Sequence, residues 1–301
     1  MVVMNARIGD REGTAPGVKN ARQALREAEA VTSPILVTGG TGTLGRLVVA
    51  RLRDAGHDVR VLSRHGHEGA EGIEYVTGDL AKGDGIEPAA EGAEVIIHCA
   101  GSSKGDDDKT RHLVQAASPT ATRHLAYISV VGADRVPMAG RIDRAMFGYF
   151  GAKFRAERIV ADSGLPWTTL RATQFHDLTL TAVRQVARLP VIPVPSGFRF
   201  QPIDAGEVAA RLVELALGTP AGLVPDMGGP RVYPMADLVR GYLRARGKRR
   251  PILSVPIPGR AARALREGAN LTPDRAVGSR TWEDFLAAQL GPPGDDRPGP
   301  T

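Results

Sequence analysis

Three glycines, Gly39, Gly42 and Gly45, lie in the segment TGGTGTLG (residues 38–45) at the spacing of a turn that binds phosphate groups. Glycine at these positions permits a tight turn, close approach of the backbone to a pyrophosphate, and close packing of a helix on a strand. The phosphates would bind the exposed amides at the helix N-terminus. We therefore predict that a dinucleotide is bound by Gly39, Thr41, Gly42, Thr43, Leu44 and Gly45.

The residues at the end of the next apolar run, Ser63, Arg64 and His65, bear on which dinucleotide is bound. An acidic residue there would bind the free ribose hydroxyl of NAD, whereas an arginine accommodates the 2′-phosphate of NADP. The chain has no carboxylate there before Glu68. One charge-assisted hydrogen bond from Arg64 would favour NADP(H) roughly 10- to 100-fold. We expect NADP(H) to be preferred, with Ser63 and Arg64 in its site, and NAD(H) to be the alternative if Arg64 is only a solvated charge.

Strand-like and helical runs must alternate to position such a turn, and they do so over residues 34–175. We expect strands at residues 35–39, 58–63, 73–78, 94–101, 124–132 and 167–173. We expect helices at residues 46–54, 109–117 and 149–163. This alternation predicts an α/β fold with a doubly wound, Rossmann-type parallel sheet, which would form a dinucleotide-binding domain over residues 34–175.

The pattern changes after about residue 174. Proline-rich connections precede helices expected at residues 207–217, 235–246 and 281–289, with strand-like runs at 222–227 and 251–258. We predict a smaller substrate-binding lobe over residues 176–290, packed near the carboxyl ends of the strands, where ligands of α/β folds bind. Residues 1–33 carry no strand pattern and are predicted to be a flexible extension. Residues 291–301, rich in proline, glycine and charge, are predicted to be a disordered tail.

Composition narrows the classes of partner. The net charge is +6, but the densest basic run, residues 244–250, suits the dipole of a helix end, and aromatic residues make up only 5% of the chain. Few rings are thus available to stack on bases, and we expect no nucleic-acid partner. No apolar run or secretory signal points to a membrane, and the single cysteine fits a reducing compartment. We expect a cytoplasmic protein, a monomer or homodimer, with a small-molecule substrate and no metal.

Further short motifs follow the glycine turn in a fixed order: GDL (78–80), CAG (99–101), ISVVG (128–132) and YFGAK (149–153). With them, the sequence from residue 34 to about 290 resembles the short-chain dehydrogenase/reductase superfamily, on its extended or atypical NmrA-like branch. The segments LPWTTLRATQF (165–175) and FQPIDAGEVA (200–209) are similar to that branch too. The resemblance implies adenine contacts from Asp79 and Leu80, ribose contacts from Cys99, Ala100 and Gly101, and nicotinamide contacts from Thr173, Gln174 and Phe175.

The resemblance also implies a catalytic group made of Ser129, Tyr149 and Lys153. Residues four apart lie on one helix face, so Tyr149 and Lys153 could both reach the nicotinamide ribose, and Lys153 would anchor it. A phenol is a poor acid at pH 7, but a neighbouring ammonium and the oxidised nicotinamide favour phenolate, which makes Tyr149 a better acid or base. Tyr149 would then protonate a carbonyl oxygen that Ser129 holds by a hydrogen bond.

These features favour an NAD(P)-dependent oxidoreductase that uses NADPH to reduce a small carbonyl or enone. Two alternatives stay open. Some NmrA-like proteins are non-catalytic redox sensors that bind a dinucleotide, although they often lack the tyrosine. Nucleotide-sugar epimerases and dehydratases also resemble extended members, although Arg64 speaks against the tightly bound NAD that they usually keep. His176 and Asp177 could touch substrate, but a loop histidine paired with its neighbour is the simpler interpretation.

Overall fold

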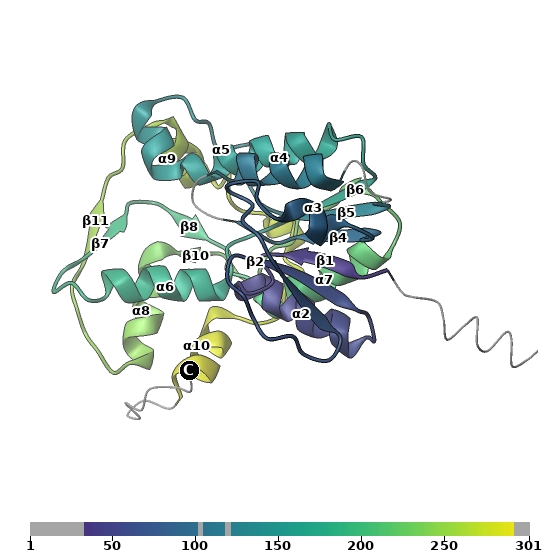
Figure 1. Cartoon of the computed structure of the whole chain (residues 1–301). Helices are drawn as coiled ribbons and strands as arrows, with labels where there is room; N and C mark the ends of the chain where they lie inside the picture. Colours follow the sequence, from purple (N-terminus) through teal and green to yellow (C-terminus); the bar gives the residue numbers. More distant parts are fainter. Residues whose placement is uncertain (1–32, 102–104, 118–121, 292–301) are drawn as a thin grey trace, which may run out of the picture. The chain divides into compact units, whose positions relative to one another are not determined.

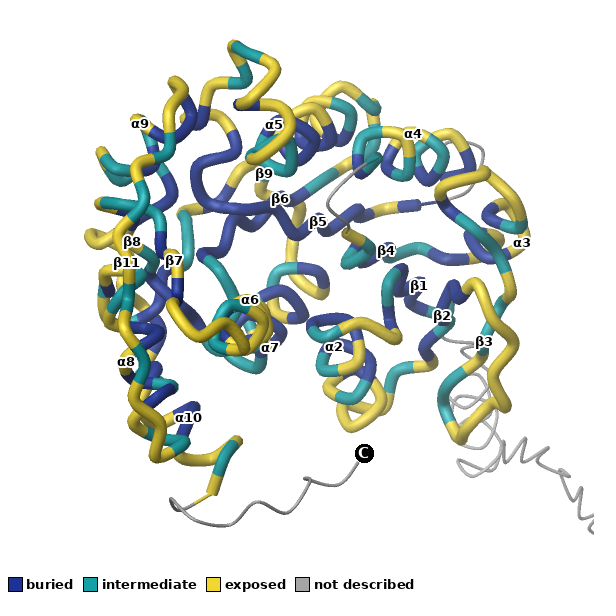
Figure 2. Tube along the Cα trace, turned by 90° about the vertical axis from the view of Figure 1, so that its left-hand side faces the viewer, coloured by how far each residue is buried: buried dark blue, intermediate teal, exposed yellow. Residues whose placement is uncertain are grey.

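Six apolar runs form the strands expected of them, and a seventh, short strand joins them at one edge. The computed structural model describes residues 33–101, 105–117 and 122–291. The strands are β1 (Ile35–Thr38), β2 (Val59–Ser63), β3 (Ile73–Thr77), β4 (Val95–His98), β5 (His124–Val130), β6 (Trp167–Ala172) and β9 (Gly222–Leu223). They form one sheet (Figure 1) in the order β3-β2-β1-β4-β5-β6-β9, and each pairing is parallel. Figure 2 labels each of these strands. The predicted Rossmann-type sheet is therefore confirmed.

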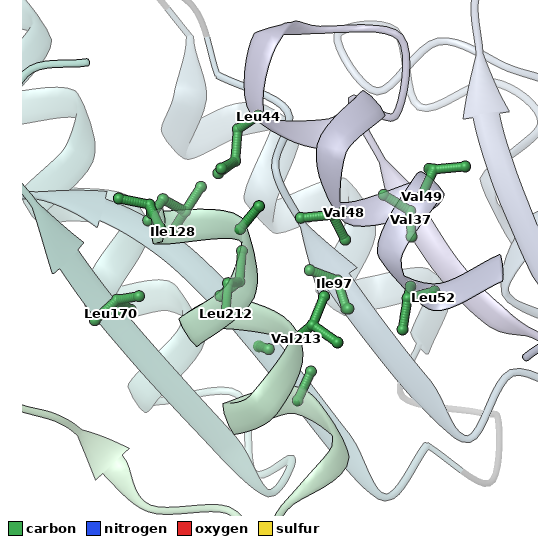
Figure 3. Close-up of a cluster of buried hydrophobic side chains, with 14 of the residues drawn as sticks. Val37, Leu44, Val48, Val49, Leu52, Ile97, Ile128, Leu170, Leu212 and Val213 are labelled. Carbon is green, nitrogen blue, oxygen red and sulfur yellow. The ribbon is translucent and has the colours of Figure 1, made fainter. Parts of the chain in front are cut away.

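Helices cover both faces of this sheet. One face packs against α2 (Thr43–Asp54) and α7 (Ala205–Leu217). The other packs against α3 (Ile86–Ala90), α4 (Asp106–Ala117) and α5 (Arg141–Ala161). The central strands are consequently buried, as Figure 2 shows, which is why they read as continuous apolar runs. Figure 3 shows the first of these layers, with Val48 and Leu212 among the side chains that pack on the sheet.

The residues after β6 also build a second group of elements. Its helices are α6 (His176–Val186), α8 (Met235–Ala245), α9 (Arg260–Glu267), the short η1 (Pro273–Arg275) and α10 (Trp282–Leu290). Strand β7 (Ile192–Pro195) pairs in parallel with β11 (Ile252–Val255), and β8 (Arg199–Phe200) pairs antiparallel with β10 (Tyr233–Pro234). A separate apolar cluster joins α6, α8 and α10. Helix α7 and strand β9 also follow residue 175, but they belong to the layers of the main sheet. The domain boundary expected at residue 175 stays a prediction.

Some expected elements were wrong in extent or kind. Helix α5 begins at Arg141 rather than at Tyr149, because the Asp143 carboxylate accepts a hydrogen bond from the Gly140 amide and caps the added turns. Residues 176–186, where only a loop around His176 was expected, form α6. The proline-rich run also contains β7, whose small sheet tolerates prolines that cannot donate a hydrogen bond.

The flexible extension predicted over residues 1–33 and the disordered tail predicted over residues 291–301 lie, except for Ser33 and Gly291, outside the described residues. None of the described helices combines the length and the apolar character that a membrane span requires.

Candidate active site

A cavity of about 470 Å³ lies where β1, β4, β5 and β6 end. Because the carboxyl ends of parallel strands meet at one edge of the sheet, motifs far apart in sequence come together here. Most of the predicted site residues line it: Gly39, Gly42, Thr43, Leu44, Gly45, Cys99, Gly101, Ser129, Tyr149, Lys153, Thr173, Gln174 and Phe175. The lining is completed by Ile128, Val130, Ala172 and Leu178, which are all apolar.

Six predicted residues do not line this cavity: Thr41, Ser63, Arg64, Asp79, Leu80 and Ala100. Pairing of β1 with β2 sets Thr38 opposite Leu62, so Ser63 and the exposed Arg64 follow at the same sheet edge as the glycine turn. Leu80, by contrast, is packed in the core beside α3 and α4. Ser63 and Arg64 thus lie at the same edge of the sheet as the residues that line the cavity, next to the glycine turn.

The glycine turn has the geometry that its spacing predicts. Gly39 has a φ of +70°, and a Cβ there would lie 2.6 Å from the Ala100 nitrogen. A Cβ on Gly45 would overlap the Gly39 carbonyl oxygen. Gly42 is the N-cap residue of α2, directly before its first helical residue, Thr43. The first turn of α2 has no acidic residue, and no side chain caps it within the described part of the chain. The amides at this helix end can therefore bind a phosphate.

Two buried polar atoms in the cavity wall point to a polar ligand. The Ser129 hydroxyl oxygen and the Gln174 amide oxygen have no hydrogen-bond partner among the described residues. A buried polar group without a partner costs about 1–3 kcal/mol, and a bound ligand would remove that cost. Together with the glycine turn, these atoms fit a dinucleotide whose nicotinamide end lies near Ser129 and Gln174.

Tyr149 and Lys153 lie on one face of α5, as four-residue spacing requires. The Lys153 ammonium nitrogen, Nζ, is 6.0 Å from the centre of the Tyr149 ring. It donates hydrogen bonds to the Tyr127 hydroxyl at 3.2 Å and the Ile128 carbonyl at 3.1 Å, and it pairs with Asp106 at 3.2 Å. Burial alone would lower the pKa of Lys153, but Tyr127, Tyr149 and Asp106 raise it above its ordinary value.

Burial and two charged neighbours set the pKa of the Tyr149 phenol. Burial raises the pKa of Tyr149, the Lys153 ammonium lowers it and Asp106 raises it again, so that the pKa lies above its ordinary value. Within the chain itself, burial thus outweighs the ammonium that we expected to favour phenolate. The phenol keeps its proton at neutral pH and has one to donate.

The cysteine in the cavity wall is half-buried. Burial raises the pKa of the Cys99 thiol to about 12, and the nearby Lys153 offsets this only in part. Since the thiolate is the reactive form of cysteine, this environment disfavours nucleophilic chemistry at Cys99.

A buried chain of hydrogen bonds supports the site from behind. Thr110 donates to the Asp106 carbonyl at 2.7 Å, so its oxygen must accept from Nε2 of His98 at 3.1 Å. His98 Nδ1 then accepts from the Thr38 hydroxyl at 2.6 Å. Burial lowers the pKa of His98 to about 3, with Lys153 and Lys109 acting in the same direction. The neutral imidazole thus ties the ends of β1 and β4 to the start of α4.

Besides the four apolar lining residues, sequence reasoning missed two polar residues behind the cavity wall and misjudged one histidine. Tyr127 lies two positions before Ser129, on the same face of β5, and strand alternation could have found it. Asp106 begins the run DDDK, which resembles an ordinary acidic helix start and carries no signal of its own. His176 is buried at the start of α6, does not line the cavity, and has no hydrogen-bond partner for its ring among the described residues. The expected pairing of His176 with Asp177 is therefore wrong, and Leu178 reaches the cavity instead.

Several known proteins are similar to this chain in sequence or in fold. A family described as NAD(P)H-binding matches residues 39–216. An uncharacterized protein of Mycobacterium tuberculosis is 29% identical over 189 residues, or 61% of this chain and 20% of that longer protein. The (4-alkanoyl-5-oxo-2,5-dihydrofuran-3-yl)methyl phosphate reductase of Streptomyces griseus is 30% identical over 189 residues, or 62% of this chain and 64% of the relative. The NADPH-dependent quinone oxidoreductase of Escherichia coli, solved with NADPH, shares the fold at a TM-score of 0.71 and 18% identity, covering 85% of this chain and 99% of that one.

Proposed function

Because the chain belongs to the NAD(P)H-binding family, which matches more than half of its length, we propose that it is an oxidoreductase of the short-chain dehydrogenase/reductase type. In this proposal it uses NADPH to reduce a small carbonyl or enone-type compound. The observation that carries the proposal is one cavity that joins the glycine turn to Ser129, Tyr149 and Lys153. The reductases among its relatives and structural neighbours support the same reaction class.

Each of the three polar residues has a role that its surroundings support. When bound, NADPH supplies a hydride. The Ser129 hydroxyl, which has no partner among the described residues, donates a hydrogen bond to the substrate oxygen. Tyr149 donates its proton to that oxygen as negative charge develops, and its raised pKa means that the proton is present at neutral pH. Lys153 holds the phenol's surroundings positive and so eases release of the proton.

The proposed cofactor contacts follow from the same geometry. The amides of the glycine turn bind the pyrophosphate, and Arg64 binds the 2′-phosphate beyond Ser63. Gln174, with Thr173 and Phe175 beside it, binds the nicotinamide end.

The cavity wall favours a substrate with an apolar skeleton. Val130 and Phe175 are apolar, and so is Leu178, whose side chain is 56% exposed although it lines the cavity. Contact between this surface and an apolar substrate buries apolar area from water, which favours binding. The same apolar side chains cannot form hydrogen bonds with the hydroxyl groups of a sugar. We therefore propose aldehydes, ketones, quinones or enones as substrates, in the cytoplasm, where a single cysteine stays reduced.

The experiment is an assay of NADPH oxidation by absorbance across a panel of these four classes of compound. Wild type is compared with Tyr149→Phe, which removes only the acidic hydroxyl, and cofactor binding is measured for both. We expect turnover to fall at least about 100-fold in the variant, the loss typical of a missing general acid, while NADPH still binds.

Tyr242→Phe is the matched control, because Tyr242 lies on α8 and does not line the cavity. It should turn over substrate like wild type. Equal turnover by wild type and Tyr149→Phe would contradict the role of Tyr149. NADPH binding without turnover of any compound would favour the sensor.

A further inference from the structure

The ammonium that faces the candidate acid is itself held by a carboxylate from another helix. Asp106, the first residue of α4, approaches Lys153 of α5 at 3.2 Å, and the two side chains are 1% and 4% exposed. Lys153 lines the cavity, whereas Asp106 and Tyr127 lie behind the wall. A carboxylate this deeply buried has no ordinary surface role, and its place beside Lys153 bears on Tyr149.

Three oxygen atoms already surround the Lys153 nitrogen: those of the Tyr127 hydroxyl, the Ile128 carbonyl and the Asp106 carboxylate. The first two accept hydrogen bonds from Lys153, whereas the Asp106 oxygen forms an ion pair with it. No hydrogen bond joins Lys153 to Tyr149 among the described residues, so Lys153 acts on Tyr149 through its charge. The strength of that action depends on how far the Asp106 charge offsets it.

The groups that face Tyr149 come from three elements. Lys153 lies on its own helix, Asp106 on α4 and Tyr127 on β5. Lys109 of α4 approaches the second oxygen of Asp106 at 3.9 Å from the more exposed side. His98 and Cys99, on β4, carry no charge at neutral pH. The Asp106 carboxylate thus pairs with the ammonium groups of both Lys109 and Lys153. It is the negative charge that acts on Tyr149.

We propose that Asp106 is a positioning residue for Tyr149: its carboxylate binds the Lys153 ammonium and offsets that charge at the phenol, so that Tyr149 keeps the proton that it donates to substrate. This inference deepens the proposed function and rests on it. It predicts the sign of a change. Removing the carboxylate leaves Lys153 unbalanced, which favours phenolate and lowers the pKa of Tyr149.

The test is a spectrophotometric titration of tyrosinate on the free protein, with no substrate or cofactor. Each variant is titrated with and without Tyr149→Phe, so that the difference reports the titration of Tyr149 and its coupling to Tyr127, whose pKa is raised to about 12. We expect Asp106→Asn to lower the pKa of Tyr149 by at least about one pH unit, a tenfold change in ionisation. The matched control is Asp107→Asn, the same substitution one position along, where the carboxylate pairs with Arg155 at 2.7 Å. It should leave the titration of Tyr149 unchanged.

A second variant removes both charges together and keeps the test decisive if Asp106→Asn folds poorly. Asp106→Asn combined with Lys153→Met removes both members of the buried pair. If the two charges balance at Tyr149, its pKa should stay within about half a pH unit of wild type. An unchanged pKa in Asp106→Asn, or a rise of one unit or more in the double variant, would overturn the inference. Neither reading involves turnover, so failure of the proposed reductase activity is detected separately.

Discussion

At the scale of single residues, we propose that Arg64 decides between the two nicotinamide cofactors. Its side chain is exposed after β2, at the same sheet edge as the glycine turn. It forms no hydrogen bond, ion pair or ring contact with any described residue. A guanidinium in this position is available to a 2′-phosphate, and its planar fork suits phosphate oxygens. We therefore expect Arg64→Ala to change cofactor choice and to leave the fold intact.

This predicts a selective effect of Arg64→Ala. We expect the Kd for NADPH to rise roughly 10- to 100-fold, because one or more charge-assisted hydrogen bonds to the 2′-phosphate are lost. The Kd for NADH should not change, since NADH lacks that phosphate. Titration calorimetry with both cofactors measures the two constants.

Arg53→Ala serves as the control, because Arg53 lies at the far end of α2 and pairs with Asp54. If Arg64→Ala raises the Kd for NADPH and the Kd for NADH by the same factor, Arg64 does not bind the 2′-phosphate.

At the scale of elements, the site depends on how firmly α5 is held on the sheet. Glu157, two turns beyond Tyr149, accepts hydrogen bonds from Arg171 of β6 at 2.8 and 2.6 Å. Arg171 also pairs with Asp134 at 2.9 Å. Burial opposes the charge on Arg171, but Glu157 and Asp134 raise its pKa and keep it charged. The pair fixes the helix that carries Tyr149 and Lys153 against the strand that ends in the cavity.

Glu157→Ala should therefore lower the free energy of unfolding by about 3 kcal/mol. This is the lower end of the range for breaking a buried ion pair, because Asp134 still faces the guanidinium. Urea unfolding at neutral pH measures the change. Glu267→Ala, which removes an exposed partner of Arg263 on α9, should leave the unfolding midpoint unchanged. Equal midpoints for Glu157→Ala and wild type would show that the pair does not hold α5.

The sequence predicted elements best where burial on two sides leaves a continuous apolar run. Strands β1, β2, β4, β5 and β6 were found for this reason, whereas β3 lies at the sheet edge and has no buried residue. The glycine turn was found because backbone geometry restricts it to glycine. The start of α5 was missed because its added turns, which contain Ile142 and Met146, depend on the cap from Asp143. Asp106 and Tyr127 were missed because their role depends on contacts between α4, α5 and β5, which no local pattern records.

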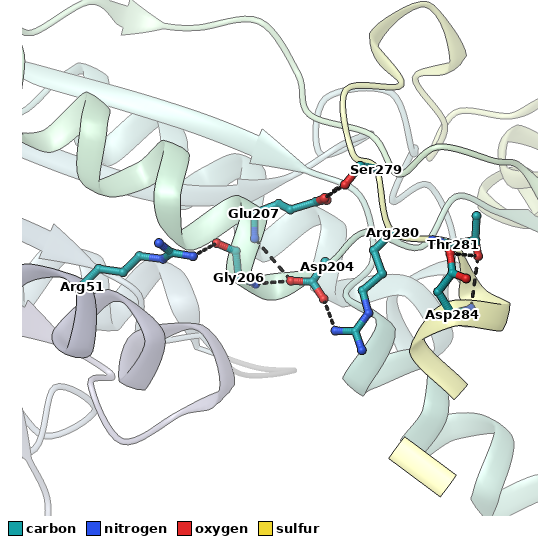
Figure 4. Close-up of polar contacts among 8 residues, drawn as sticks. All are labelled: Arg51, Asp204, Gly206, Glu207, Ser279, Arg280, Thr281 and Asp284. Carbon is teal, nitrogen blue, oxygen red and sulfur yellow. Dashed lines mark hydrogen bonds and ion pairs between the residues drawn. The ribbon is translucent and has the colours of Figure 1, made fainter. Parts of the chain in front are cut away.

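At the scale of the whole described unit, the segment before α10 is tied back to the sheet layer. Asp204 caps α7 through the Gly206 amide at 2.7 Å and pairs with Arg280 at 2.8 Å, as Figure 4 shows. Glu207 accepts a hydrogen bond from the Ser279 amide at 2.9 Å. These contacts hold α10 where Phe285 stacks on His176 of α6, at 4.9 Å between ring centres. The stability of this junction therefore depends on the protonation state of a buried histidine.

His176 should make the fold sensitive to acid. Burial lowers its pKa to about 4, while the same side chain in the unfolded chain titrates near 6.5. Between these values the unfolded chain binds the proton and the folded chain does not, so stability falls as the pH falls. One such group contributes a slope of about 1.4 kcal/mol per pH unit, or about 2 kcal/mol between pH 6.5 and 5.

His176→Phe should remove this contribution. Neither ring nitrogen has a hydrogen-bond partner among the described residues, and phenylalanine can keep the stacking on Phe285 and Trp282. Urea unfolding should thus give the variant a stability close to that of wild type at pH 7.5 and an advantage of about 2 kcal/mol at pH 5. His98 offers the contrast: both of its nitrogens are hydrogen-bonded, so His98→Phe should destabilise the fold at either pH. Equal losses of stability between pH 7.5 and 5 in wild type and His176→Phe would show that His176 is not the group that titrates.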